Sequence, residues 1–171
     1  NADEQTRRLT YAADLLLCAS WEPMTAAERE AALNSTLVQV EYKFKDLPVE
    51  ELDTEAGKKL QKAGITERFH WPLEFPEVFF DSNGLKKDAG FDAVVGNPPY
   101  GYTQDETSKS FLKSFYKVKE NKFDLYNFFI ELGINLGRRN AFFSYIVPLS
   151  WMEYSRTVRL RKMLLSEVTL V

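Results

Sequence analysis

Apolar residues recur at helical spacing through the first part of the chain. One such pattern covers roughly residues 3 to 20 and predicts an amphipathic helix that must pack against another element. Its apolar positions are Leu9, Ala12, Ala13, Leu16 and Leu17. Thr25 and Glu28 then resemble a capping box, in which the two side chains satisfy backbone amides at a helix start. A second helix is therefore expected from there to about Leu37.

A third helical pattern follows, and the composition changes after it. The residues that share its apolar face are Leu52, Ala56, Leu60 and Ala63. Gly64 is placed to end this helix in a left-handed conformation. Aromatic residues and prolines dominate from Phe69 onward. We therefore expect residues 1–65 to form a helical segment and residues 66–171 to form a second region, with a boundary near Ile65.

The second region has the pattern of a parallel α/β unit. Residues 91–95 are a short apolar run bounded by glycine, which predicts a strand buried on both faces. Residues 123–136 predict a helix that Gly137 ends, with Leu125, Phe128, Phe129, Leu132 and Leu136 inward. Residues 141–147 predict another buried strand, which Pro148 stops. A strand, a helical crossover and a strand predict parallel pairing with a right-handed connection.

The two ends of the sequence suggest that it belongs to a longer protein. Residues 155–165 predict a further helix, and residues 168–171 have the composition of a strand that is just beginning. The chain also opens inside a helical pattern. We therefore expect an excised fragment of a larger protein.

Composition narrows the classes of protein without naming one. Of the 171 residues, 44% are hydrophobic and 14% aromatic, enough for a globular core. No run of about 18 apolar residues or signal-peptide pattern occurs, so we expect a soluble, cytoplasmic protein with no membrane partner. Cys18 is the only cysteine, which excludes an internal disulfide and a cysteine-cluster metal site, and we expect no metal. The net charge of -3 gives no global reason for nucleic-acid binding, so any such function must come from a site.

The candidate site follows the first predicted strand directly. Asn97, Pro98, Pro99 and Tyr100 come after Gly96, where ligands gather in open parallel sheets. Gly96 allows backbone to approach a ligand closely, and the proline after Asn97 favours an extended conformation there. The two prolines have carbonyl groups but no N–H donors. The segment is therefore predicted to be a stiff edge of hydrogen-bond acceptors beside an aromatic ring.

This edge suits a flat group that carries an exocyclic amine. The Asn97 oxygen and the Pro98 carbonyl can accept the two amine hydrogens while Tyr100 stacks on the ring, and adenine fits that description. Polarised N–H bonds would make the amine nitrogen more nucleophilic toward a sulfonium methyl group. No covalent intermediate is required, and no Cys-His or Ser-His-Asp set is discernible.

A series of motifs carries a resemblance to a known family. Residues 91–101 (FDAVVGNPPYG) resemble motif IV of the amino-methyltransferases, and residues 69–79 resemble large fused restriction-modification enzymes of the Eco57I type. Asp124-Leu125-Tyr126, residues 128–131 and residues 143–151 are similar to the motifs that follow in that family. The match covers about residues 69 to 171.

The resemblance implies an adenine-N6-specific DNA methyltransferase from a restriction-modification enzyme. The implied fold is a partial Rossmann-like S-adenosylmethionine-dependent methyltransferase fold, preceded by the helical segment. The implied methyl donor is S-adenosylmethionine, and the acceptor is an adenine flipped out of double-stranded DNA. Asn97, Pro98, Pro99 and Tyr100 would form the catalytic pocket, and Phe129 would flank the cofactor adenine. His70 is the other candidate cofactor contact, although many relatives have an acidic residue there; a packed, hydrogen-bonded histidine is the alternative.

The sequence also departs from the family pattern and leaves alternatives open. The glycine-rich cofactor loop of the family should lie upstream, and residues 1–68 contain no such loop. Cofactor-binding and target-recognition regions are therefore expected in missing parts of the parent chain, and the fragment alone is expected to bind cofactor poorly or not at all. The alternatives are a non-catalytic interaction or scaffold module, and a related enzyme that methylates a protein glutamine or an RNA amine.

Overall fold

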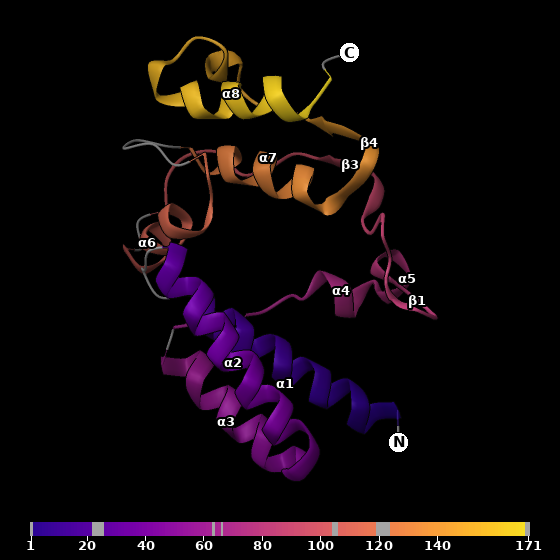
Figure 1. Cartoon of the computed structure of the whole chain (residues 1–171). Helices are drawn as coiled ribbons and strands as arrows, with labels where there is room; N and C mark the ends of the chain where they lie inside the picture. Colours follow the sequence, from indigo (N-terminus) through magenta and orange to yellow (C-terminus); the bar gives the residue numbers. More distant parts are fainter. Residues whose placement is uncertain are drawn as a thin grey trace. The chain divides into compact units, whose positions relative to one another are not determined.

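The computed structural model describes residues 2–21, 26–62, 64–65, 67–103, 106–118 and 124–169. The chain divides into two compact units, Asn1–Pro76 and Glu77–Val171. Figure 1 follows the chain through both. The boundary expected near Ile65 remains a prediction about domains. Among the described residues, no helix is both long and apolar enough to cross a membrane.

The first unit is built on helices α1 (Ala2–Trp21), α2 (Ala26–Asp46) and α3 (Val49–Lys62). Helix α1 packs against both α2 and α3, as Figure 1 shows. The buried residues of their core are Tyr11, Leu15, Leu52 and Ala56. The first and third predicted helices are confirmed, whereas the second runs past the expected end at Leu37 to Asp46. The predicted cap at Thr25 lies outside the described residues.

Gly64 ends α3 as the sequence predicted. Its φ is 73°, in the left-handed region. The Ile65 N–H donates to the Leu60 carbonyl at 2.9 Å and the Gly64 N–H to the Gln61 carbonyl at 3.0 Å. These two bonds satisfy carbonyl groups that the helix end leaves without partners.

Short elements lead from the helices to the main sheet. Helices α4 (Trp71–Glu74) and α5 (Pro76–Phe79) are single turns. Strands β1 (Phe80–Asp81) and β2 (Gly84–Leu85) then pair antiparallel. The Asn83 N–H donates to the Asp81 carboxylate at 2.7 Å inside their turn.

The second unit is centred on two parallel strands, β3 (Phe91–Gly96) and β4 (Gly137–Tyr145). Val94 pairs with Phe143, and Gly96 pairs with Tyr145 at the carboxyl end. Near the amino end the register shifts between Phe91 and Ala93. The predicted parallel α/β unit is thus confirmed at the level of a mixed α/β region with a two-stranded parallel sheet.

The crossover between the strands contains α6 (Glu106–Phe115) and α7 (Leu125–Leu136). Helix α7 packs on both strands, and α8 (Val158–Glu167) contributes to the same core. Short 3-10 turns η1 (Leu149–Trp151) and η2 (Ser155–Thr157) connect β4 to α8. The main buried residues are Val118, Tyr126, Phe128, Ile130, Leu160, Met163 and Leu164. Gly137 ends α7 as expected, with extended backbone at φ −77°.

Two predictions about burial are wrong. The strands are not buried on both faces, because Val95 is 78% exposed and Phe142 is 76% exposed. Helix α7 packs on the face that carries Phe143 and Tyr145, and Val95 and Phe142 lie outside that core. Phe129 was expected inward but is 38% exposed, because α7 turns Phe128 and Ile130 toward the core instead. Of the strand expected at 168–171, Val168 and Thr169 are irregular and the other residues lie outside the described part.

Candidate functional site

The predicted tetrapeptide lies where both parallel strands end. Strand β3 ends at Gly96, directly before Asn97, and β4 ends at the paired Tyr145. The Ile146 N–H donates to the Gly96 carbonyl at 3.1 Å and continues the pairing by one residue. Two chain segments far apart in sequence therefore leave the sheet side by side at its carboxyl end, as ligand sites in such sheets require.

Gly96 brings the two strands close together at this point. A Cβ atom built on Gly96 would lie 3.1 Å from Cε1 of the Tyr145 ring, tighter than ordinary contact. A side chain here would push against the partly buried Tyr145 ring. After Gly96, Pro98 is buried, while Asn97, Pro99 and Tyr100 are exposed.

The Tyr100 hydroxyl ties the tetrapeptide to the end of β4. It lies 3.0 Å from the Ile146 carbonyl oxygen and 3.2 Å from Oδ1 of Asn97. A phenol has one proton, so the shorter contact is the better place for it. The ring remains 51% exposed and presents its free surface to solvent. Tyr100 is thus held at its tip while its face is available for stacking.

Asn97 keeps acceptor capacity in this arrangement. An amide oxygen has two lone pairs, so one remains for a ligand even when the Tyr100 hydroxyl donates to the other. Asn97 is exposed, and the two prolines that follow supply no competing N–H donor. The site can therefore receive a flat donor group against an aromatic ring.

Tyr126 supports Tyr100 from below. The two rings meet edge to face, with centroids 6.3 Å apart and planes at 88°. Tyr126 is buried at the start of α7, and that burial raises the pKa of its phenol, an effect that the Ser150 side chain opposes. Burial also raises the pKa of the Tyr145 phenol. The Tyr126 and Tyr145 side chains next to the site therefore keep their phenol protons.

The chain that leaves β4 is clamped into a compact turn. Thr157 is buried, and its hydroxyl lies 2.8 Å from the Trp151 carbonyl and 2.7 Å from the Tyr154 carbonyl. Nη1 of Arg161 donates to the same carbonyls, each at 2.8 Å. Arg156 lies over the Tyr154 ring, 4.2 Å from its centroid. This side of the site therefore has a fixed backbone.

The two predicted cofactor contacts lie in different units. Phe129 projects from α7 with its ring partly exposed, which leaves it free to contact a flat ligand. His70 belongs to the first unit, where its Nε2 lies 2.8 Å from Oδ1 of the buried Asp14. Nε of Arg68 also lies 2.8 Å from that oxygen. His70 is thus a hydrogen-bonded structural residue in this structure, and a cofactor role for either residue stays a prediction.

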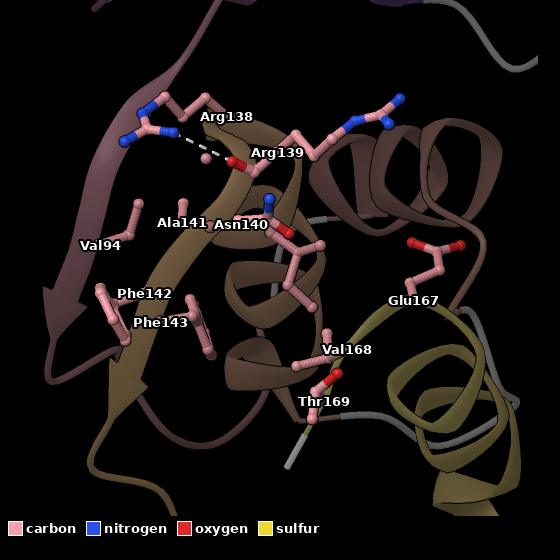
Figure 2. Close-up of a pocket in the computed structure, with 13 residues that line it drawn as sticks. Val94, Arg138, Arg139, Asn140, Ala141, Phe142, Phe143, Glu167, Val168 and Thr169 are labelled. Carbon is pink, nitrogen blue, oxygen red and sulfur yellow. Dashed lines mark hydrogen bonds between the residues drawn. The ribbon is translucent and has the colours of Figure 1, made fainter. Parts of the chain in front are cut away.

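A separate pocket lies toward the amino end of β4 (Figure 2). Its volume is about 450 Å³, and its lining includes Val94, Arg138, Arg139, Glu167 and Thr169. Arg138 donates to the carbonyl of Arg139 at 3.2 Å, the dashed bond in Figure 2, and its Nε lies 2.6 Å from Asp92. None of the four tetrapeptide residues lines this pocket.

The sequence did not single out the residues that hold the tetrapeptide in place. The Ile146 carbonyl, the Tyr126 ring and the Thr157–Arg161 clamp were not expected to contribute. Tyr126 belongs to the Asp124-Leu125-Tyr126 motif, so the sequence did contain a signal for its position. The carbonyl contact carries no side-chain signature and becomes visible only with the strand register.

Comparison with known proteins gives a matching family and several relatives. The family model "Eco57I restriction-modification methylase" matches residues 6–171, which includes both units. A putative type II restriction enzyme and methyltransferase of Methanocaldococcus jannaschii is 30% identical over 102 residues, 60% of this chain and 8% of that protein. The type II restriction enzyme and methyltransferase RM.Eco57I of Escherichia coli is 33% identical over 79 residues, 43% of this chain and 8% of that protein.

A smaller methyltransferase also matches. The type II methyltransferase M.TthHB8I of Thermus thermophilus is 29% identical over 86 residues, 45% of this chain and 20% of that protein. The chain thus spans between 8% and 20% of the length of these relatives. No solved structure matches. Because the family model matches nearly the whole chain, this chain belongs to the Eco57I restriction-modification methylase family.

Proposed function

We propose that this chain is part of a DNA methyltransferase that methylates the N6 amine of adenine, with the base flipped out of double-stranded DNA. The observation that carries the proposal is the placement of Asn97 and Tyr100 at the carboxyl end of β3, with the Tyr100 hydroxyl 3.0 Å from the Ile146 carbonyl. This gives an amine acceptor beside an anchored aromatic ring. A flipped adenine needs both, since its edge is read by hydrogen bonds and its face by stacking.

The residues act by holding and polarising the amine. The Asn97 amide oxygen and the Pro98 carbonyl accept its two hydrogens, which draws electron density onto the nitrogen. S-adenosylmethionine supplies the electrophilic methyl group. The nitrogen forms a bond to that methyl carbon as the carbon–sulfur bond breaks, and the surplus proton on nitrogen passes to water after transfer. No covalent bond to the protein forms in this scheme.

The cofactor site is only partly represented in this chain. Phe129 fits an aromatic contact with the cofactor, because its ring is partly exposed on α7. His70 fits less well, because Asp14 already holds its Nε2. We infer that β3 and β4 are neighbouring strands of a larger Rossmann-like sheet, and that the glycine-rich loop and the target-recognition region come from other parts of the full-length protein.

The test is methyl transfer by the full-length protein with Asn97→Ala. Loss of one amine acceptor is expected to lower kcat about 100-fold or more, while DNA affinity stays near that of wild type. Asn135→Ala is a matched control, because Asn135 is an exposed asparagine on α7 outside the site. Methyl incorporation by Asn97→Ala equal to that of Asn135→Ala would contradict the proposed role.

Product analysis distinguishes the competing functions. Nucleosides from methylated DNA are separated by mass, and N6-methyladenine is the expected product. Methylation of RNA or of a protein glutamine in place of DNA would support the related enzyme classes. Absence of any methyl transfer by the full-length wild-type protein would favour a scaffold role.

A further inference from the structure

Glu131 is a buried carboxylate that binds backbone rather than a cation. It lies in the middle of α7 and is 4% exposed. The Lys117 N–H donates to its two oxygens at 3.0 and 2.9 Å, and the Val118 N–H donates to Oε2 at 2.9 Å. Both carboxylate oxygens are therefore engaged by two consecutive backbone amides.

Because the carboxylate of Glu131 is buried, it needs these hydrogen bonds, and they hold the backbone at Lys117 and Val118 in place. A buried charge is tolerated only when hydrogen bonds or opposite charges compensate its lost hydration. Within the described part of the chain no Lys, Arg or His pairs with Glu131, and the Lys117 ammonium lies 4.0 Å from Glu167 instead. The two amides of Lys117 and Val118 thus carry the compensation.

Helix α7 also binds the chain at Gly101, directly after Tyr100. The Leu125 N–H, at the start of α7, donates to the Gly101 carbonyl at 2.8 Å. Gly101 has φ +89°, which lets the chain turn sharply after Tyr100. Helix α7 therefore binds Gly101 through a backbone bond, and Lys117 and Val118 through Glu131.

We propose that Glu131 is a positioning residue for methyl transfer, acting through helix α7 on Tyr100. The inference rests on the proposed function. Helix α7 reaches Tyr100 through the Tyr126 ring and through the bond from Leu125 to Gly101, the residue after Tyr100. Loss of the bonds between Glu131 and the backbone of Lys117 and Val118 therefore reaches Tyr100 as a shift of α7. Glu131 touches neither substrate nor the reacting atoms, and its effect is on the placement of the stacking ring.

The first experiment measures the anchor itself, without any activity. Amide hydrogen exchange is compared between the full-length wild-type protein and Glu131→Gln, which keeps the shape but replaces one acceptor oxygen with an NH₂ donor. The Lys117 and Val118 amides are expected to exchange faster in the variant. Glu106→Gln is the matched control, because Glu106 is an exposed glutamate on α6, the helix that precedes Lys117. Equal exchange in wild type and Glu131→Gln would overturn the anchor.

The second experiment asks whether the anchor reaches the site. We expect Glu131→Gln to lower kcat by about tenfold to 100-fold, as small misplacements of reacting groups do, with KM for S-adenosylmethionine within about twofold of wild type. The fluorescence of 2-aminopurine at the target position should also change, because its stacking partner moves. Glu106→Gln should match wild type in both. An unchanged kcat and an unchanged signal in Glu131→Gln would overturn the positioning role.

These outcomes separate the inference from the proposed function. If wild type produces no N6-methyladenine, the proposed function fails, while the exchange experiment still tests the anchor. If wild type is active and Glu131→Gln is equally active, only the positioning role fails. If Glu131→Gln does not fold, Glu131→Asp, which keeps the charge on a shorter side chain, is judged by the same criteria.

Discussion

The two ends of the parallel strands in the second unit are built differently. At the amino end, a pocket of about 450 Å³ is lined by Arg138 and Arg139, and Arg138 is paired with Asp92. At the carboxyl end, Asn97 and Tyr100 are exposed but held by hydrogen bonds and by a buried aromatic floor. The amino end has room, and the carboxyl end has oriented acceptors.

This difference indicates that the candidate site is identified by two chain segments that meet, and not by the volume of a pocket. Consecutive parallel strands both release their chains at the carboxyl end, so residues distant in sequence meet there. At the amino end, Gly90 lies so close to β4 that an added Cβ would come within 2.5 Å of the Arg138 backbone nitrogen. Beside the pocket, the two strands are therefore packed closely, and the Arg138–Asp92 ion pair joins them.

The largest effect at the carboxyl end is expected from Tyr100→Ala, which tests whether this end binds the base. Removing the ring should weaken capture of an unpaired base by roughly 1 to 3 kcal/mol, the contribution of stacking on an aromatic side chain. The measurement is 2-aminopurine fluorescence at the target position with the full-length protein bound to DNA.

Tyr100→Phe is the matched control for that change. It keeps the stacking face but loses the hydroxyl that lies 3.0 Å from the Ile146 carbonyl. We expect a smaller effect than for Tyr100→Ala. A 2-aminopurine signal for Tyr100→Ala identical to wild type would rule out the stacking role, and equal loss in both variants would show that the hydroxyl, not the ring, matters.

Alkaline pH should affect the carboxyl end before the amino end. Burial raises the pKa of the Tyr126 and Tyr145 phenols above the ordinary value of 10.0. The unfolded chain then loses these protons first, so their contribution to stability is full below pH 10.0 and declines as pH rises through the folded-state values. At the amino end, the hydrogen bond and charge of Asp92 raise the pKa of Arg138, so Arg138 stays charged.

Denaturant unfolding midpoints measured from neutral pH to above pH 10.0 check this expectation. The midpoint should be flat below that value and fall above it. Tyr145→Phe removes one titrating phenol while keeping the ring, so its midpoint should fall less steeply than that of wild type. Parallel curves for the two proteins would show that Tyr145 does not contribute.

Much of the carboxyl end could be predicted from sequence because its signals are local. Glycine, asparagine and two prolines after an apolar run specify a strand end and a stiff acceptor edge within a few residues. The Tyr100–Ile146 contact could not be predicted, because it joins residues 46 positions apart and depends on the register of two strands. Glu131 was also missed as a functional residue, because its partners are backbone amides that any sequence supplies.

The burial errors have a different physical origin. The apolar pattern of β3 and β4 predicted cover on both faces, yet Val95 and Phe142 are exposed because α7 packs on one face only. Phe129 was misplaced because three neighbouring positions, Phe128, Phe129 and Ile130, are all apolar, and composition alone does not say which two face the core. Which face of α7 points inward depends on its packing against the strands and α8.

The smallest effect on activity is expected from a substitution at the amino end. Arg139→Ala removes an exposed cation from the pocket of Figure 2 without breaking the Arg138–Asp92 pair. Substitutions at exposed positions usually change stability by no more than about 0.5 kcal/mol, so we expect kcat and KM within about twofold of wild type and a nearly unchanged unfolding midpoint. Steady-state methyl transfer on the same DNA measures this. A loss of activity as large as that of Tyr100→Ala would show that the pocket takes part in function and that the contrast between the two ends is wrong.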